Sequence, residues 1–140
     1  MPKLDAERLQ RFLVEEGLDG RGRFVVEDVG EMTARVRLRA TSRNLRPGGT
    51  LSGASLMALA DLAIYAALLG EIGLVPLAVT TSLTINFLRK PPLADVLAEA
   101  RLLKVGKSLA FGEIVLASEG DPRPVAHATS TYSIPPRPPA

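Results

Sequence analysis

The chain has 140 residues, of which 46% are hydrophobic and 23% charged, a balance typical of one folded domain with a substantial core rather than of a disordered chain. The 17 basic and 15 acidic residues give a formal net charge of +2, which does not favour binding to nucleic acid. There is no cysteine, so disulfides, thiolate chemistry and cysteine-bound metals are excluded.

A short helix and a β-hairpin are predicted first. Apolar residues recur near helical spacing in residues 4–16, which predicts an amphipathic helix within an N-terminal segment of residues 1–19. This charged start is not typical of a signal peptide, so we expect a cytoplasmic protein. Apolar and polar residues alternate from Met32 to Ala40, which predicts a strand paired with residues 22–29. Its polar face carries three arginines that we interpret as a solvated face discouraging edge pairing: Arg35, Arg37 and Arg39.

An apolar helix is predicted next, after a loop over 44–50, from Ser52 to about Leu69. Leu, Ala, Met and Ile occupy every side of it, so it should be covered all round. Asp61 stands in its middle, and a carboxylate there must be satisfied by partners or used in chemistry. The apolar run over 54–69 is shorter than the roughly 20 residues of a membrane span and contains this acid, so we expect no contact with a membrane.

Four alternating segments after the helix predict an antiparallel meander, over residues 77–88, 95–105, 108–118 and 123–134. A proline-rich extended tail is predicted over 135–140. We therefore expect a single α+β domain over residues 1–140, in which a curved antiparallel sheet of about six strands wraps around one long central helix. One sheet covers only part of such a helix, and a second copy of the chain is the simplest further cover, which predicts a homodimer with facing helices.

Four stretches together carry a resemblance to a known family: "GGTLSGASLMALADLA", "VTTSLTINFLRKP", "ARLLKVGKSLAFGEIVL" and "VAHATSTYSI". Over residues 20–134 the chain resembles the hotdog-fold acyl-CoA thioesterase superfamily, and within it the phenylacetic-acid-degradation type. The resemblance implies a hotdog fold, hydrolysis of an acyl-CoA thioester and no cofactor. Dimers, and dimers of dimers, are common in that family, and the sequence leaves the choice between dimer and tetramer open.

The resemblance also implies site residues. The family motif His-Gly-Gly at the helix start reads Ser52-Gly53-Ala54 here, and Arg46 stands where the family has Asn. The family role of Gly53 is to polarise the thioester carbonyl with its backbone N–H. Asp61 corresponds to the acid that activates water or attacks directly, and Thr80 to the hydroxyl residue that helps to hold the attacking water.

Substrate binding is assigned to five positions. Two of them are the motif positions of Ser52 and Arg46. In the family, basic residues near strand ends and turns contact the phosphates of coenzyme A, and here these positions are Arg89, Lys90 and Lys107.

The spacing along the helix adds an argument of its own. Gly53 and Asp61 are eight residues apart, which is about 12 Å along a helix at ~1.5 Å per residue. A carbonyl oxygen must lie about 3 Å from its donor, so one helix cannot supply both groups to one thioester. Two antiparallel helices across a dimer could, each giving Gly53 to one site and Asp61 to the other.

Other interpretations of these residues stay open. Asp61 could fix the register of a dimer by hydrogen bonding rather than act on a substrate. Ser52 is most simply a helix N-cap, and the spacing does not favour a triad of Ser55, His127 and Asp61. The loss of the motif His and Asn suggests a non-catalytic acyl-CoA binder as one alternative function, and a structural assembly module is another. The acyl group also stays open, because pocket length depends on how Met57, Tyr65 and Phe87 are placed.

Overall fold

The computed structural model describes residues 2–40, 45–46, 50–92 and 94–136, with only the backbone described at residues 45, 46 and 50. Its elements, in chain order, are α1 (Ala6–Glu15), β1 (Phe24–Gly30), β2 (Thr33–Leu38), β3 (Leu45–Arg46), β4 (Thr50–Leu51), α2 (Gly53–Ile72), β5 (Val79–Phe87), β6 (Val96–Val105), β7 (Leu109–Ser118) and β8 (Pro124–Ser133). The loop predicted over 44–50 thus contains the short strand β3 and the first residue of β4. The tail predicted over 135–140 is described at Pro135 and Pro136 only.

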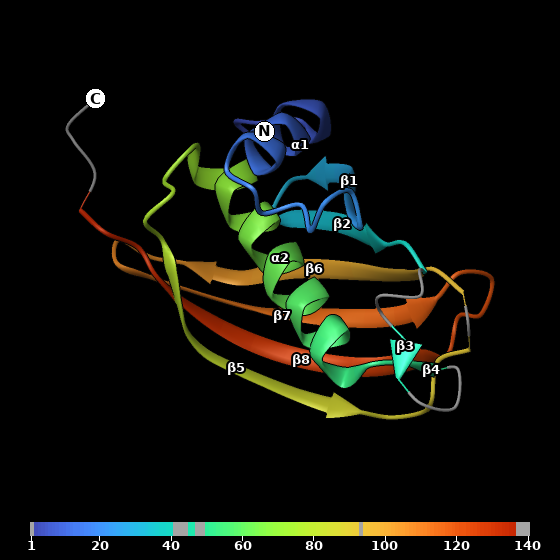
Figure 1. Ribbon diagram of the computed structural model, residues 1–140. Coiled ribbons are helices and arrows are strands. Elements are labelled where there is room, and N and C mark those ends of the chain that lie inside the picture. The colour runs from blue at the N-terminus through green and yellow to red at the C-terminus, as the bar shows by residue number, and fades with distance from the viewer. Residues whose placement is uncertain (1, 41–44, 47–49, 93, 137–140) are drawn as a thin grey trace.

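Six strands form one antiparallel sheet in the order β1-β2-β6-β7-β8-β5, and α2 lies across one face of it (Figure 1). The predicted strands are confirmed, and the alternation is clearest in β6, β7 and β8, whose inward positions are buried. The predicted meander is confirmed for β6 to β8 only, because β5 pairs with β8 and β6 pairs with β2, which leaves β1 and β5 as the two edges of the sheet.

Capping residues set the bounds of α2. The Ser52 hydroxyl accepts a hydrogen bond from the Ser55 amide at 3.1 Å, which starts the helix at Gly53. The helix continues past the expected end at Leu69, because Gly73 with φ +91° is the residue that stops it. Gly70 serves packing instead, since a side-chain carbon there would lie 2.6 Å from Cγ1 of Val29.

The burial of α2 identifies it as the core helix of the fold. By length and composition it could cross a membrane, with a mean hydropathy of 1.7, but 67% of that apolar stretch is buried inside the chain. One stripe stays outside, along the exposed residues Ala54, Met57 and Ala58. Within one chain, therefore, the helix is not covered all round.

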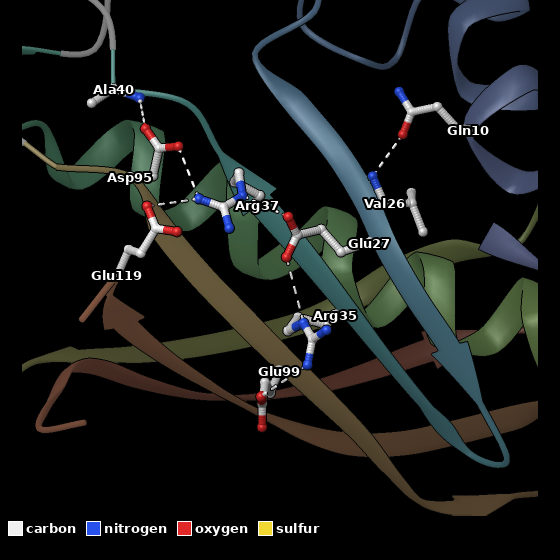
Figure 2. Close-up of polar contacts among 9 residues, drawn as sticks. All are labelled: Gln10, Val26, Glu27, Arg35, Arg37, Ala40, Asp95, Glu99 and Glu119. Carbon is white, nitrogen blue, oxygen red and sulfur yellow. Dashed lines mark hydrogen bonds and ion pairs between the residues drawn. The ribbon is translucent and has the colours of Figure 1, made fainter. Parts of the chain in front are cut away.

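Arg37 lies at the centre of an ion-pair network on the outer face of the sheet (Figure 2). Its guanidinium contacts Glu27 at 2.6 Å, Asp95 at 3.0 Å and Glu119 at 3.0 Å. These hydrogen bonds, that of Glu119 foremost, raise the pKa of Arg37 further above its usual value. The interpretation of Arg35, Arg37 and Arg39 as a face that discourages edge pairing is wrong, because β2 lies inside the sheet between β1 and β6.

The two edges of the sheet differ in their cover. At β1, the Gln10 side chain from α1 accepts from the Val26 amide at 2.6 Å and donates to the Phe24 carbonyl at 3.2 Å, so α1 occupies backbone groups of that edge. At the other edge, β5 pairs with β8 on one side only. Six of its nine residues are exposed and the other three are half-buried, unlike the residues of the inner strands.

Candidate active site

Asp61 opens onto a pocket of about 540 Å³ between α2, the start of β5 and the end of β8. The wall is mainly apolar, with side chains that include Leu18, Phe24, Leu62 and Val79. The pocket therefore combines one carboxylate with an apolar cavity large enough for a small organic group.

Two hydroxyls hold the Asp61 carboxylate. Thr80 Oγ1 donates to Oδ1 at 2.7 Å, and the Tyr132 hydroxyl donates to the same oxygen at 2.9 Å. Thr80 and Tyr132 are register partners of β5 and β8, which explains why both hydroxyls reach one oxygen atom. Asp61 and Thr80 are thus brought together as the sequence predicts.

Thr80 lies beside the acid on the wall of the same pocket. Its hydroxyl donates to the carboxylate of Asp61, and its predicted role of helping to hold the attacking water stays a prediction.

Tyr132 is a site residue that the sequence did not single out. It is 4% exposed, and its ring stacks on Tyr65 with 6.0 Å between centroids. Burial, with the negative charge of Asp61, raises the pKa of Tyr132 well above its usual range, so the phenol stays protonated and donates. The available signal was its inward position in the alternating strand "VAHATSTYSI", because a buried tyrosine needs a partner for its hydroxyl.

The N-terminus of α2 lies in a second pocket, of about 440 Å³. Gly53 lines it together with Phe87, Arg89 and Lys90, so three of the predicted site residues meet here. Ser52 is the N-cap, as the simpler interpretation predicts. A helix start leaves its first amides without intrahelical partners, and the partial positive charge of the helix adds to them, which suits an oxyanion.

The register places the remaining basic residues. Leu109 and Val79 both pair with Ser133, so the turn that contains Lys107 lies at the β5 end nearest Thr80, away from Arg89. Lys107 therefore shares an end of the sheet with Asp61, and Arg89 and Lys90 share the other with Gly53. The side chain of Arg46 lies outside the part of the chain that is described.

The triad of Ser55, His127 and Asp61 is not assembled. His127 pairs with Asn86 and Val115, and its Nε2 lies 3.3 Å from Oε2 of Glu113 on the outer face. Ser55 is engaged with the Ser52 hydroxyl at 3.0 Å. Among the residues described, no group of three His, Asp or Glu could hold a metal ion.

Comparisons with known proteins identify the family of this chain. The family model of the thioesterase superfamily matches residues 48–125. A candidate thioesterase from Silicibacter sp. is 44% identical, with a TM-score of 0.90 over 97% of this chain and 95% of that one. A mutant of the phenylacetic acid degradation protein PaaI from Thermus thermophilus is 25% identical, with a TM-score of 0.74 over 85% of this chain and 99% of that one.

A thioesterase from Haemophilus influenzae shares the fold at 19% identity, with a TM-score of 0.85 over 96% of this chain and 92% of that one. A search of the curated proteins finds no match. The family model covers more than half of the chain, including both the start of α2 and Asp61. The chain belongs to the thioesterase superfamily, and it is a thioester hydrolase with the hotdog fold of that family.

Proposed function

We propose that this protein is an acyl-CoA thioesterase whose active site forms between two copies of the chain. The observation that carries the proposal is the Asp61 carboxylate, which two hydroxyls hold on the wall of a largely apolar pocket of about 540 Å³. A carboxylate so placed can activate water or attack a thioester whose acyl group occupies the pocket.

The second half of the site is Gly53 of the partner subunit. Within one chain Gly53 and Asp61 line different pockets, as their separation along α2 requires. A donor for the oxyanion that develops beside Asp61 must therefore come from elsewhere, and a second α2 running antiparallel supplies one.

Two features of the chain support such a dimer. The first is the exposed stripe of α2 at Ala54, Met57 and Ala58. The second is the β5 edge, which carries the exposed apolar side chains of Val79 and Phe87. Antiparallel pairing of two β5 edges about a twofold axis would set two α2 helices side by side and antiparallel, which satisfies backbone groups of both edges.

The chemistry follows from this arrangement. Asp61 accepts a proton from a water molecule as the water oxygen bonds to the thioester carbon, and the carbonyl oxygen, now negative, accepts a hydrogen bond from the amide of Gly53 of the partner subunit. The carbon–sulfur bond then breaks, the coenzyme A thiolate takes up the proton, and the free acid leaves. In the alternative, the Asp61 carboxylate attacks the thioester carbon directly, the carbon–sulfur bond breaks and the coenzyme A thiolate leaves, which gives an anhydride. Water then hydrolyses this anhydride to the free acid and Asp61, and the thiolate takes up the proton that is released.

Coenzyme A would meet basic residues from both chains. Lys107 lies at the Asp61 end of its own sheet, and Arg89 and Lys90 of the partner subunit accompany its Gly53. The dimer thus gathers all three predicted cations at one site, where they can bind the phosphates.

Asp61→Asn tests the proposal. With a panel of aryl- and fatty-acyl-CoA esters, we expect the wild-type enzyme to hydrolyse at least one ester. In the variant we expect kcat to fall about 10²–10⁴-fold, which is the usual contribution of a general base. Size-exclusion chromatography and thermal unfolding check that the variant keeps its assembly. Wild-type activity in Asp61→Asn would refute the site, and stabilisation of the wild type by esters without turnover would favour the non-catalytic binder.

A further inference from the structure

The hydrogen bonding of the Asp61 carboxylate is one-sided. Oδ1 accepts from Thr80 at 2.7 Å and from Tyr132 at 2.9 Å. Among the residues described, none donates to Oδ2. One oxygen is therefore anchored to the sheet, and the other is available to the pocket that Asp61 lines.

We propose that Tyr132 is a positioning residue for the hydrolysis, because its hydroxyl fixes Oδ1 and thereby presents Oδ2 to the attacking water or the thioester. The inference rests on the proposed role of Asp61 as the acting group. Tyr132 itself contacts Asp61 and not the reacting atoms, so it acts through the acid.

The placement of the Tyr132 hydroxyl favours this role over simple core filling. The hydroxyl lies 3.3 Å from the Asp61 carbonyl oxygen as well as 2.9 Å from Oδ1. It therefore contacts the backbone of α2 and the carboxylate together, so rotation of the Asp61 side chain would break a contact. The ring cannot follow such a rotation, because it is buried and stacked on Tyr65.

Tyr132→Phe is the test, since it keeps the ring and removes only the hydroxyl. A hydrogen bond to a charged group is worth about one to two factors of ten in a rate that depends on it, so we expect kcat to fall about 10- to 100-fold with KM changed less. In an Asp61→Asn background the same change should lower kcat little further, because Tyr132 acts through the acid. Ser130→Ala is the matched control, because it also removes a buried hydroxyl from this face of β8. The Ser130 hydroxyl has no hydrogen-bond partner among the described residues.

The outcomes separate this inference from the proposed function. A Tyr132→Phe enzyme with wild-type kcat, beside an impaired Asp61→Asn enzyme, overturns the role of Tyr132 alone. A fall in kcat that is just as large in the Asp61→Asn background also overturns it, because that is the result of a structural role. A wild type that hydrolyses no acyl-CoA ester overturns both proposals.

A second measurement serves if Tyr132→Phe does not fold. Replacing the tyrosines with 3-fluorotyrosine keeps their shape and makes the phenols stronger donors. We expect kcat to change with KM nearly constant, and an unchanged kcat overturns the inference.

Discussion

Gly53 combines two properties at the start of α2 that bear on the proposed chemistry. It is the first helical residue after the Ser52 cap, so its amide belongs to the group that a helix leaves without an internal partner. A side-chain carbon there would lie 3.3 Å from Cζ of Phe87, which is itself half exposed. The absence of a side chain thus keeps the ring and the amide close together at the pocket wall.

A pair of substitutions isolates the amide of Gly53. Gly53→Pro removes the N–H, and proline fits the first position of a helix and the extended ψ of 148° at Ser52. Gly53→Ala places a similar carbon beside Phe87 but keeps the donor. Loss of one oxyanion donor reduces kcat by about 10²–10³-fold, so we expect the proline variant to fall that far below the alanine variant.

Steady-state kinetics with one acyl-CoA ester, and thermal unfolding of both variants, measure this difference. Equal kcat values in two folded variants would show that the Gly53 amide is not the oxyanion donor.

At the scale of elements, the Arg37 network ties four neighbouring strands of the sheet together: β1, β2, β6 and β7 (Figure 2). Arg37 on β2 pairs with Glu27 on β1 and with Glu119 just after β7. Asp95, just before β6, pairs with Arg37 and also accepts from the Ala40 amide at 2.8 Å. One carboxylate therefore fixes the chain leaving β2 against the chain entering β6.

This network predicts an acid-sensitive contribution to stability. The Ala40 amide, and after it Arg37, lower the pKa of Asp95 below its usual 3.8. Because the folded pKa is depressed, the stabilisation is present above pH 3.8 and is lost as the pH falls through the lower folded value. We expect Asp95→Asn to reduce the free energy of unfolding by about 1–2 kcal/mol at pH 7. This difference should shrink as the pH falls below 3.8.

Chemical denaturation at pH 7 and pH 3 checks this expectation. Asp121→Asn is the control, because Asp121 is half-buried and, among the described residues, its side chain pairs with its near neighbour Arg123, at 2.9 Å, rather than with another strand. An equal effect of the two variants would mean that the Asp95 contacts do not join the strands energetically.

At the scale of the whole molecule, periodicity predicted which elements form and which faces they bury. The alternation from Met32 to Ala40 became β2, and the apolar run that ends near Leu69 became α2. It did not predict neighbours, because a period of two gives the face of a residue but not the strand beside it. Arg37 was misjudged for that reason, since β2 acquires an inner place by pairing with a strand some sixty residues away.

The residues of the candidate site also differ in whether local sequence could predict them. Asp61 stood out because an acid in an apolar helix is visible locally, and Gly53 and Thr80 followed from the family motif. Tyr132 could not be assigned, because its meeting with Thr80 depends on the β5–β8 register, which a bulge between Thr80 and Ser82 shifts. Residues whose role arises from long-range pairing are the ones that sequence patterns miss.

The division of the proposed site between two chains allows a decisive test by complementation. If Asp61 of one subunit works with Gly53 of its partner, a heterodimer of one Asp61→Asn chain and one Gly53→Pro chain has both lesions in one site and none in the other. Purified through two different tags, it should regain about half of the wild-type activity per dimer, although both parent homodimers are inactive. A heterodimer of Asp61→Asn and Asp61→Ala chains is the control and should stay inactive. If the site lay within one chain, each site of the first heterodimer would carry a lesion, and the absence of regained activity in a verified heterodimer would refute the shared site.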